Sequence, residues 1–259
     1  MHKKTASYDA TAALCMVVFA MSCTTRYFYV ANASDPAPLQ DFCVAVDHPS
    51  PHTGIPTFIN GKFCKNPKEV VINDFLYKGF NIPGDTNNTQ RAKVTALDIN
   101  RFPALNTLGV SMARVDFAPF GLNTPHSHPR ASEVTAVIEG SLYAGFITTD
   151  NRLFDTVLNK GDVMVFPQGL IHFQLNLGKK TALAIAAFGS QDPGRVDVAE
   201  SVFGSRPNIL DEVLTKAYQV DDKIVEKLRA QFSSHNVSVD TGRSILKLFA
   251  QASSDDCGY

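Results

Sequence analysis

The chain has 259 residues, of which 44% are apolar, so it is long enough to bury the core of one large β domain or two small ones. Its formal charge of −1 excludes the polybasic surface that would attract nucleic acid or acidic lipid. Glycine and proline are frequent and phenylalanine is plentiful, which is typical of a compact sheet protein.

The N-terminal residues have the features of a secretory signal. A basic start, MHKK, precedes the apolar run AALCMVVFAM at 12–21, which is too short to span a bilayer. The segment Ala31-Asn32-Ala33 then fits a cleavage site of small residues. We predict a signal peptide over residues 1–33 and a secreted mature chain without membrane attachment. The alternative is an N-terminal membrane anchor, which Arg26 disfavours.

Residues 34–92 are predicted to form an extension of loops and short strands. Segments such as HPSPHTGIP and IPGDTNNT combine proline, glycine and asparagine, which interrupt regular structure. Cys43 and Cys64 bracket one such loop, where a disulfide would constrain the unfolded chain by about 3 kcal/mol. Cys257 lies in a polar tail and is predicted to be free or intermolecular.

Two glycosylation sequons remain after removal of the signal, at Asn87 and Asn236. Asn87 lies in the turn-like stretch GDTNNTQ and is therefore the better acceptor.

Residues 93–205 are predicted to form a single antiparallel β-barrel or sandwich. Short apolar segments recur at regular intervals, each bounded by Gly, Pro, Asn or Asp. The segment TALAIAAF is apolar throughout, so we expect it to be buried on both faces. The predicted strands cover 110–118, 133–140, 141–148, 162–167, 171–176 and 181–189.

The C-terminal region, 206–259, is predicted to contain a helical pair at 208–219 and 221–232, followed by a polar tail. Apolar residues recur there at helical spacing. Asp221 is the expected N-cap of the second helix, with Val220 and Val225 forming a hydrophobic staple across it.

A group of histidines and one glutamate is the clearest candidate for chemistry. His126 and His128 are one residue apart, so a strand places both imidazoles on one face, and prolines flank the pair. Glu133 follows at the start of the next apolar run, and His172 begins a strand after a Pro-Gln-Gly turn. The His-x-His pair alone also fits an acid/base pair or a polar loop.

Three imidazoles and a carboxylate together form a mixed nitrogen and oxygen set that suits a divalent transition ion. A six-coordinate ion held by four residues would keep two positions for water or substrate, unlike a closed structural zinc site. The remaining histidines of the mature chain are interpreted as surface or packing residues; they are His48, His52 and His235.

Two longer segments carry a family resemblance. GLNTPHSHPRASEVTAVIEG and GDVMVFPQGLIHFQLN resemble the two cupin boxes of plant germins and germin-like proteins. DPAPLQDFCVA, NTLGVSMARVDFAP and FGSQDPG add further similarity, so that the resemblance covers nearly the whole mature chain.

The resemblance implies an all-β fold, a single cupin β-jellyroll barrel with six-stranded sheets, followed by C-terminal helices that clasp neighbouring subunits. It further implies a manganese ion, secretion to the cell wall or apoplast, and a homohexamer built as a trimer of dimers. By motif position, the cysteine pair matches the family's internal disulfide, and the metal ligands match His126, His128, Glu133 and His172.

Two positions depart from the family pattern. Phe120 stands where the first cupin box usually has the first glycine of a pair. Ala113 stands where the oxalate oxidases of the family place an asparagine that hydrogen-bonds substrate together with a second asparagine, matched here by Asn123. An alanine methyl cannot donate that bond, and one buried hydrogen bond contributes on the order of 1–3 kcal/mol to discrimination.

We therefore expect a secreted manganese cupin that dismutes superoxide, a small oxygen species, and acts in defence or stress. The alternatives are a non-enzymatic wall glycoprotein or receptor-type protein, and an oxalate oxidase, which Ala113 disfavours. Neither composition nor spacing identifies a catalytic residue beyond the metal ligands, apart from Asn123 as a candidate neighbour of the metal.

Overall fold

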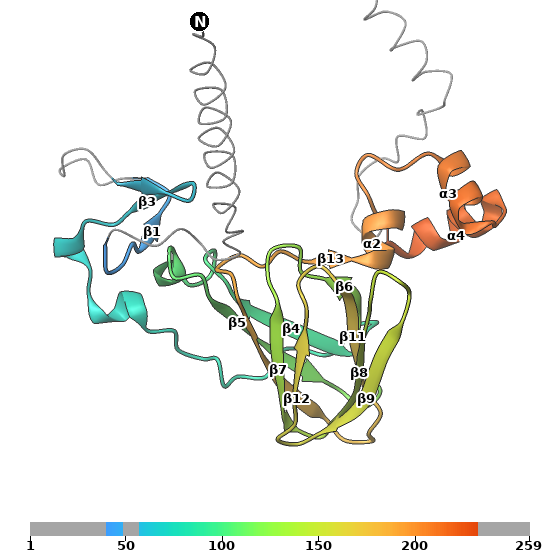
Figure 1. Ribbon diagram of the computed structural model, residues 1–259, viewed down its shortest axis with the longest axis horizontal. Coiled ribbons are helices and arrows are strands. Elements are labelled where there is room, and N and C mark those ends of the chain that lie inside the picture. The colour runs from blue at the N-terminus through green and yellow to red at the C-terminus, as the bar shows by residue number, and fades with distance from the viewer. Residues whose placement is uncertain (1–39, 49–56, 233–259) are drawn as a thin grey trace, which may run out of the picture.

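The computed structural model describes residues 40–48 and 57–232. In these ranges the chain forms a small N-terminal sheet, a pair of larger sheets and a group of C-terminal helices, with the small sheet and the helices on opposite sides of the large sheets (Figure 1). No helix in the described part of the chain is both long and apolar enough to cross a membrane.

The N-terminal region is held together by a three-stranded sheet and a disulfide. Cys43 and Cys64 are bonded, with Cα atoms 4.9 Å apart. Three short 3-10 helices follow this sheet: η2 (Pro67–Glu69), η3 (Ile72–Phe75) and η4 (Pro103–Leu105). The strands of the sheet are β1 (Ala45–Val46), β2 (Phe58–Ile59) and β3 (Lys62–Cys64).

A buried hydrogen-bonded chain connects the disulfide to the segment after β12. The Asn106 amide donates to Cys43 Sγ over 3.0 Å and accepts from Gln191 Nε2 over 3.2 Å. Gln191 in turn accepts from the backbone N–H of Thr107 over 2.6 Å. Since all these side chains are buried, the N-terminal region is fixed to the barrel by contacts that exclude water.

Two five-stranded sheets of antiparallel strands face each other and enclose the core. One has the order β10-β7-β12-β5-β4 and the other β13-β6-β11-β8-β9. The all-β prediction is confirmed, although each sheet has five strands among the described residues rather than the six implied by the resemblance. The strands are β4 (Ala92–Leu97), β5 (Ser111–Phe117), β6 (Leu122–Ser127), β7 (Glu133–Glu139), β8 (Ser141–Ile147), β9 (Leu153–Asn159), β10 (Val163–Phe166), β11 (Ile171–Asn176), β12 (Ala182–Phe188) and β13 (Val196–Asp197).

The core between the sheets consists of alternate residues from both layers. The largest of its fully buried side chains are Phe117, Phe166 and Leu142, with smaller alanines from β8 and β12 between them. Alternation of inward and outward residues along each strand produces this packing. All six strands predicted from the apolar pattern are present within a residue or two of their expected limits.

The prediction that β12 is buried on both faces was wrong. Its inward residues are buried, whereas Leu183 and Ile185 are half-buried and Ala187 is exposed. β12 lies at the centre of its sheet, between β7 and β5, and no described element of the same chain covers the outer face of that strand. The apolar outward residues therefore form a surface rather than a second core.

The C-terminal helices pack on one another at the side of the barrel where β13 lies (Figure 1). They are α2 (Val198–Phe203), α3 (Asp211–Tyr218) and α4 (Asp222–Phe232). The two predicted helices are confirmed as α3 and α4, while α2 is additional. Asp221 Oδ1 accepts the Ile224 N–H over 3.0 Å, as an N-cap does, and Val220 packs against the hydrophobic cluster that contains buried Val225, as the predicted staple requires.

Candidate metal centre

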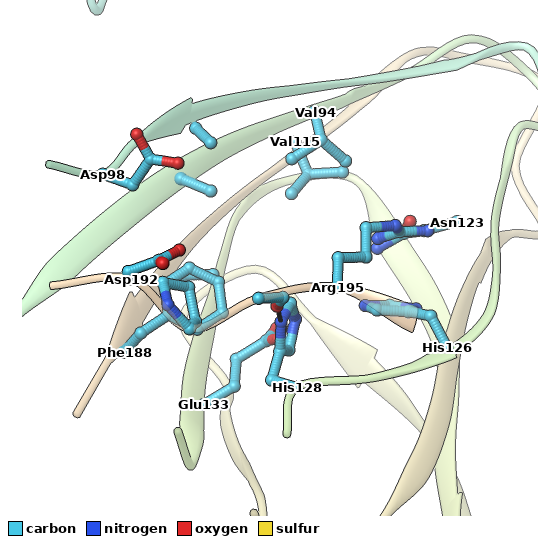
Figure 2. A pocket seen from close by; sticks show the side chains of 15 residues that line it. Val94, Asp98, Val115, Asn123, His126, His128, Glu133, Phe188, Asp192 and Arg195 are labelled. Atoms are coloured by element: carbon cyan, nitrogen blue, oxygen red, sulfur yellow. Dashed lines mark hydrogen bonds and ion pairs between the residues drawn. The ribbon is translucent and has the colours of Figure 1, made fainter. Parts of the chain in front are cut away.

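The structure brings the four predicted ligands together between the two sheets. His126, His128, Glu133 and His172 are all buried, and one ligand atom from each lies within 4.8 Å of the others. Glu133 Oε2 is 3.0 Å from His128 Nε2 and 3.2 Å from His172 Nε2. Figure 2 shows Glu133, His128 and His126 converging on the floor of one pocket.

The strands position these side chains from both layers. His126 on β6 lies directly opposite His172 on β11, so the two rings meet on the inner face of one sheet, with centroids 4.2 Å apart. Glu133 is the first residue of β7, in the opposing sheet. His128 follows the end of β6. The site is therefore assembled by the packing of two sheets and not by one segment alone.

An irregularity in the pairing of β6 with β11 brings one further residue into the site. The register shifts between His172 and Gln174, so that Asn123, three residues before His126, pairs with Gln174. A bulge of this kind turns residues at odd spacing onto one face. Both Asn123 and His126 are consequently buried toward the interior.

Each of the three imidazoles is oriented by a backbone carbonyl at Nδ1. His126 Nδ1 lies 2.7 Å from Thr124 O, His172 Nδ1 lies 2.9 Å from Leu170 O, and His128 Nδ1 lies 2.5 Å from Gly194 O. A carbonyl only accepts hydrogen bonds, so Nδ1 carries the proton and Nε2 keeps its lone pair. This arrangement is the usual support of a metal-binding histidine.

Aromatic side chains shield the imidazoles from water. The Phe166 ring stacks on His172, with centroids 4.5 Å apart and planes 16° from parallel. Phe188 packs edge-on against His128 at 4.7 Å. These rings restrict the rotation of the imidazoles and lower the local dielectric, which strengthens electrostatic interactions inside the site.

Glu133 is held as a carboxylate. Burial alone would raise its pKa, but the polar contacts of its carboxylate with the His128 and His172 imidazoles and with the Thr135 hydroxyl outweigh burial and keep the pKa of Glu133 below its ordinary range. Thr135 donates a short hydrogen bond to Oε1, and Gln174 Nε2 lies 3.5 Å from the same oxygen. Oε1 is thus occupied by protein donors, while Oε2 points at the imidazoles.

His126 is held neutral. Burial lowers its pKa to about 3, and the positive charge of Arg195 acts in the same direction. A neutral imidazole is the form that binds a metal ion, because the proton and the ion compete for the same lone pair.

The donor set fits a divalent transition ion. Adjacent ligand atoms of an octahedral ion lie about 3 Å apart when each is about 2.1 Å from the metal. The two separations from Glu133 Oε2 have this value. Three neutral nitrogens and one carboxylate oxygen, with no thiolate, favour a manganese, iron or zinc type of site over a structural zinc site of cysteines.

A pocket of about 170 Å3 lies beside the four residues and reaches exposed Ala96 and Arg195 at its rim. That volume corresponds to about five water molecules at roughly 30 Å3 each, so the pocket suits a very small ligand. Ala113 of β5 is buried and lines the pocket, so it presents a methyl group where a polar side chain could contact a ligand.

Asn123 also lines the pocket, but its side-chain amide is already engaged. Nδ2 donates to Gln174 Oε1 over 2.6 Å. Through Gln174 this residue is connected to Glu133, the only carboxylate of the four candidate ligands. Asn123 therefore contacts both the pocket and Gln174, which lies beside the candidate ligand Glu133.

Several residues of the site were missed by the sequence analysis. Thr135 and Gln174 support Glu133, but hydroxyl and amide side chains on strands give no distinctive pattern. Arg195, which directly precedes β13, lines the pocket and pairs over 2.6 Å with Asp197 of β13. Burial raises the pKa of Asp197, yet hydrogen bonds from Arg195 and Thr124 keep it below its ordinary value. Only the tertiary structure places this pair beside His126.

The other predicted residues lie away from the centre or outside the described ranges. His48 is exposed, and Asn87 lies in an exposed turn whose backbone N–H bonds to Asp85. His52, His235, Asn236, Cys257 and the predicted signal segment 1–33 fall outside the described residues.

Comparisons with known proteins agree with the observed fold. The sequence model of the family described as "Cupin" matches residues 78–226. The chain is 53% identical over 204 residues to "Germin-like protein subfamily 1 member 7" of Arabidopsis thaliana, covering 78% of this chain and 87% of the relative. It is 52% identical to "Putative germin-like protein 2-1" of Oryza sativa subsp. japonica, covering 78% and 92%.

Among solved structures, the chain is similar to an oxalate oxidase in complex with the substrate analogue glycolate. The identity is 42%, the TM-score is 0.72, and the match covers 78% of this chain and all of the oxalate oxidase chain. The jellyroll arrangement predicted from the sequence is thereby confirmed.

Proposed function

The chain belongs to the germin-like proteins of the cupin family, and from this membership we propose that it is a secreted manganese protein of the plant cell wall that dismutes superoxide. The observation that carries the proposal is the convergence of three Nε2 atoms and Glu133 Oε2 beside a pocket only large enough for a very small ligand. Superoxide fits such a pocket without any specific recognition group.

The chemistry divides between the ion and the chain. When bound, the ion would supply one-electron cycling, by which one superoxide is oxidised to dioxygen and a second is reduced and takes up two protons to form hydrogen peroxide. The chain holds Nε2 of His126, His128 and His172 unprotonated by binding their Nδ1–H groups. Thr135 and Gln174 fix Glu133 with one oxygen toward the ion. Phe166 and Phe188 exclude water from two sides.

The remaining parts of the proposal concern location and assembly. The predicted signal at 1–33, the disulfide between Cys43 and Cys64, and the sequons at Asn87 and Asn236 support export to the apoplast as a glycoprotein. The apolar outer face of the sheet around β12 supports a homo-oligomer, for which we propose the hexamer of the germins, a trimer of dimers.

The proposed activity is tested on purified protein loaded with manganese. We expect the protein to remove superoxide, and His128→Ala to lose both the metal and the activity, because His128 Nε2 is one of four converging donors. His48→Ala is the matched control, since His48 is exposed and distant from these donors; it should keep both. Metal-replete protein that leaves superoxide untouched contradicts the enzymatic proposal.

The same variants separate a non-enzymatic role from catalysis. If a defence or stress phenotype, or the binding of a wall partner, survives His128→Ala, the protein acts as a wall glycoprotein and its metal is dispensable for that role. Loss of the phenotype in His128→Ala but not in His48→Ala instead ties the role to the metal centre.

Oxalate oxidation is the second candidate, favoured by the structural similarity to oxalate oxidase. Two observations weigh against it. Ala113 presents only a methyl group to the pocket, and the Asn123 amide donates to Gln174. We expect no oxalate oxidation by the natural protein and a gain in Ala113→Asn, measured as peroxide release from oxalate. Vigorous oxidation by the unmodified protein contradicts this ranking.

A further inference from the structure

Arg195 is a cation at the rim of the metal pocket that neither the metal site nor the fold explains. Among the described residues that line the pocket, it is the only lysine or arginine. Its side chain is 30% exposed, so it reaches both solvent and the pocket. Figure 2 draws its guanidinium above His126, on the side of the pocket where Asn123 is labelled.

The guanidinium is fixed along one edge. Nε donates to Asp197 Oδ2 and Nη2 donates to Asp197 Oδ1, both over 2.6 Å, and Nη2 also lies 3.3 Å from Thr124 Oγ1. This is the side-on, two-point geometry that holds an arginine rigidly. The part of the chain that the structure describes gives Nη1 no partner, so its two N–H groups remain able to donate to a ligand.

Apart from the candidate ligand Glu133, the acidic residues that line the pocket lie on its other side. Asp98 and Asp192 are drawn across the pocket from Arg195 in Figure 2. Asp192 is neutralised by Arg130 at 2.9 Å, whereas Asp98 binds backbone N–H groups of residues 100 and 101. Asp197 compensates the charge of Arg195 in the same way, so the attraction that remains on this side comes from the Nη1 N–H groups, while Asp98 repels an anion.

Resting on the manganese proposal above, we propose that Arg195 forms an anion-binding position at the mouth of the pocket, which orients a small oxygen anion toward the metal. Three neutral imidazoles and one carboxylate leave a divalent ion with a net positive charge, so an anion would lie between that ion and the N–H donors at Nη1 of Arg195. Arg195 would thereby supply a hydrogen-bond donor to the ligand, which the methyl group of Ala113 cannot do.

The ligand chemistry is an anion whose charge is carried by oxygen and which fits within about 170 Å3. Superoxide and a short monocarboxylate share this chemistry. The planar N–H groups of a guanidinium suit a carboxylate, and the positive field suits either anion.

Two measurements distinguish these sources. Acetate, a carboxylate without redox chemistry, is titrated calorimetrically into metal-loaded protein of known metal content. In parallel, the rate of superoxide removal is measured from low to high ionic strength. We expect Arg195→Gln to weaken acetate binding about tenfold, as for loss of a charge-assisted hydrogen bond. We also expect it to flatten the decline of the superoxide rate with salt.

Matched variants exclude a structural cause. Arg152→Gln removes the same charge just before β9, where Arg152 lies over the Phe154 ring and does not line the pocket; it should leave both measurements unchanged. Arg195→Lys keeps the charge without the planar fork, and should retain the salt dependence while binding acetate less tightly. Metal content and melting temperature are compared for every variant.

A double variant provides the decisive outcome, because Arg195→Gln leaves Asp197 without its ion pair. If Arg195→Gln/Asp197→Asn recovers acetate binding, the loss came from the exposed carboxylate and the proposal is overturned. The proposal is also overturned if Arg195→Gln leaves acetate binding and the salt dependence unchanged. A natural protein that neither binds acetate nor shows salt dependence overturns it too. Acetate binding that depends on Arg195 in a protein without superoxide activity instead refutes the dismutase proposal and leaves this one standing.

Discussion

At the scale of single residues, the backbone before β6 contains one of the two departures from the family pattern. Phe120 has a φ of 61° and is 56% exposed, so a bulky side chain occupies the left-handed region with little compensating burial. Gly121 beside it has no room for a side chain, since an added Cβ would lie 2.2 Å from Arg91 O. Phe120 therefore strains the backbone, whereas Gly121 is required because no side chain fits at that position.

Replacing Phe120 tests this explanation. We expect Phe120→Gly to raise the free energy of unfolding by about 0.5–1 kcal/mol, because relief of the left-handed conformation exceeds the entropy that glycine adds to the unfolded chain. The change is measured as the midpoint of urea unfolding at constant slope.

Gly121→Ala is the opposite control. Arg91 O already accepts the Ala118 N–H over 2.9 Å and cannot retreat freely, so we expect a loss of about 2 kcal/mol or more. Destabilisation by Phe120→Gly would show that the Phe120 ring contributes more through contacts than its exposure indicates.

At the scale of elements, α4 depends on the residue before it. Asp221 accepts the Ile224 N–H over 3.0 Å, and Val220 and Val225 belong to one hydrophobic cluster at the helix start. Helix termini leave backbone N–H groups without partners inside the helix, so a capping carboxylate stabilises the first turn. The helix was predictable from sequence because its cap, its staple and its apolar stripe are all local.

Removal of the cap should therefore weaken α4 selectively. We expect Asp221→Ala to destabilise the protein by about 1 kcal/mol and to accelerate amide exchange in the first turn of α4, as seen by hydrogen exchange with mass spectrometry. Asp221→Asn should behave almost as the natural protein, since asparagine caps equally well. Equal exchange in all three proteins would mean that packing against α2 and α3 alone holds the helix.

The strands differ in how well the local sequence predicts them. Strands with alternating apolar residues, such as β5 and β7, were predictable, because one face of each is buried. β9 was missed because it is an edge strand with a single buried residue, Leu158, and so has no alternation. β6 was missed because its inward residues, Asn123 and the candidate ligand His126, are polar and it contains Pro125.

The candidate site divides in the same way. The four ligands follow from residue types and motif, whereas Gln174 and Arg195 reach the site through strand register and a returning segment. Such long-range placement leaves no local pattern. The division of the chain at residues 33, 92 and 205 stays a prediction.

At the scale of the whole molecule, the outer face of the sheet containing β12 is the most conspicuous surface. Exposed apolar side chains from β7 and β10 adjoin the half-buried ones of β12, and these strands are neighbours. The exposed members are Val134, Ile138, Val163 and Val165. A contiguous apolar surface of this kind is typical of a subunit interface.

Charged substitutions on this surface should lower the oligomeric state. We expect Val163→Lys/Val165→Lys to convert the proposed hexamer to smaller species in analytical ultracentrifugation, since unpaired ammonium groups would be buried at the contact. Leu153→Lys/Val157→Lys, on exposed positions of β9 in the other sheet, is the matched control and should leave the assembly intact. The reverse pattern would assign the interface to the β9 sheet.

The three carbonyls that orient the histidines differ in how far along the chain they come from. Thr124 O and Leu170 O are each two residues before the imidazole they hold, but Gly194 O is 66 residues after His128. A nascent chain can therefore fix His126 and His172 as soon as β6 pairs with β11. His128 must wait until the segment before β13 has returned. We expect metal capture to be a late event in biogenesis, which protects the chain from acquiring an ion before its barrel has closed.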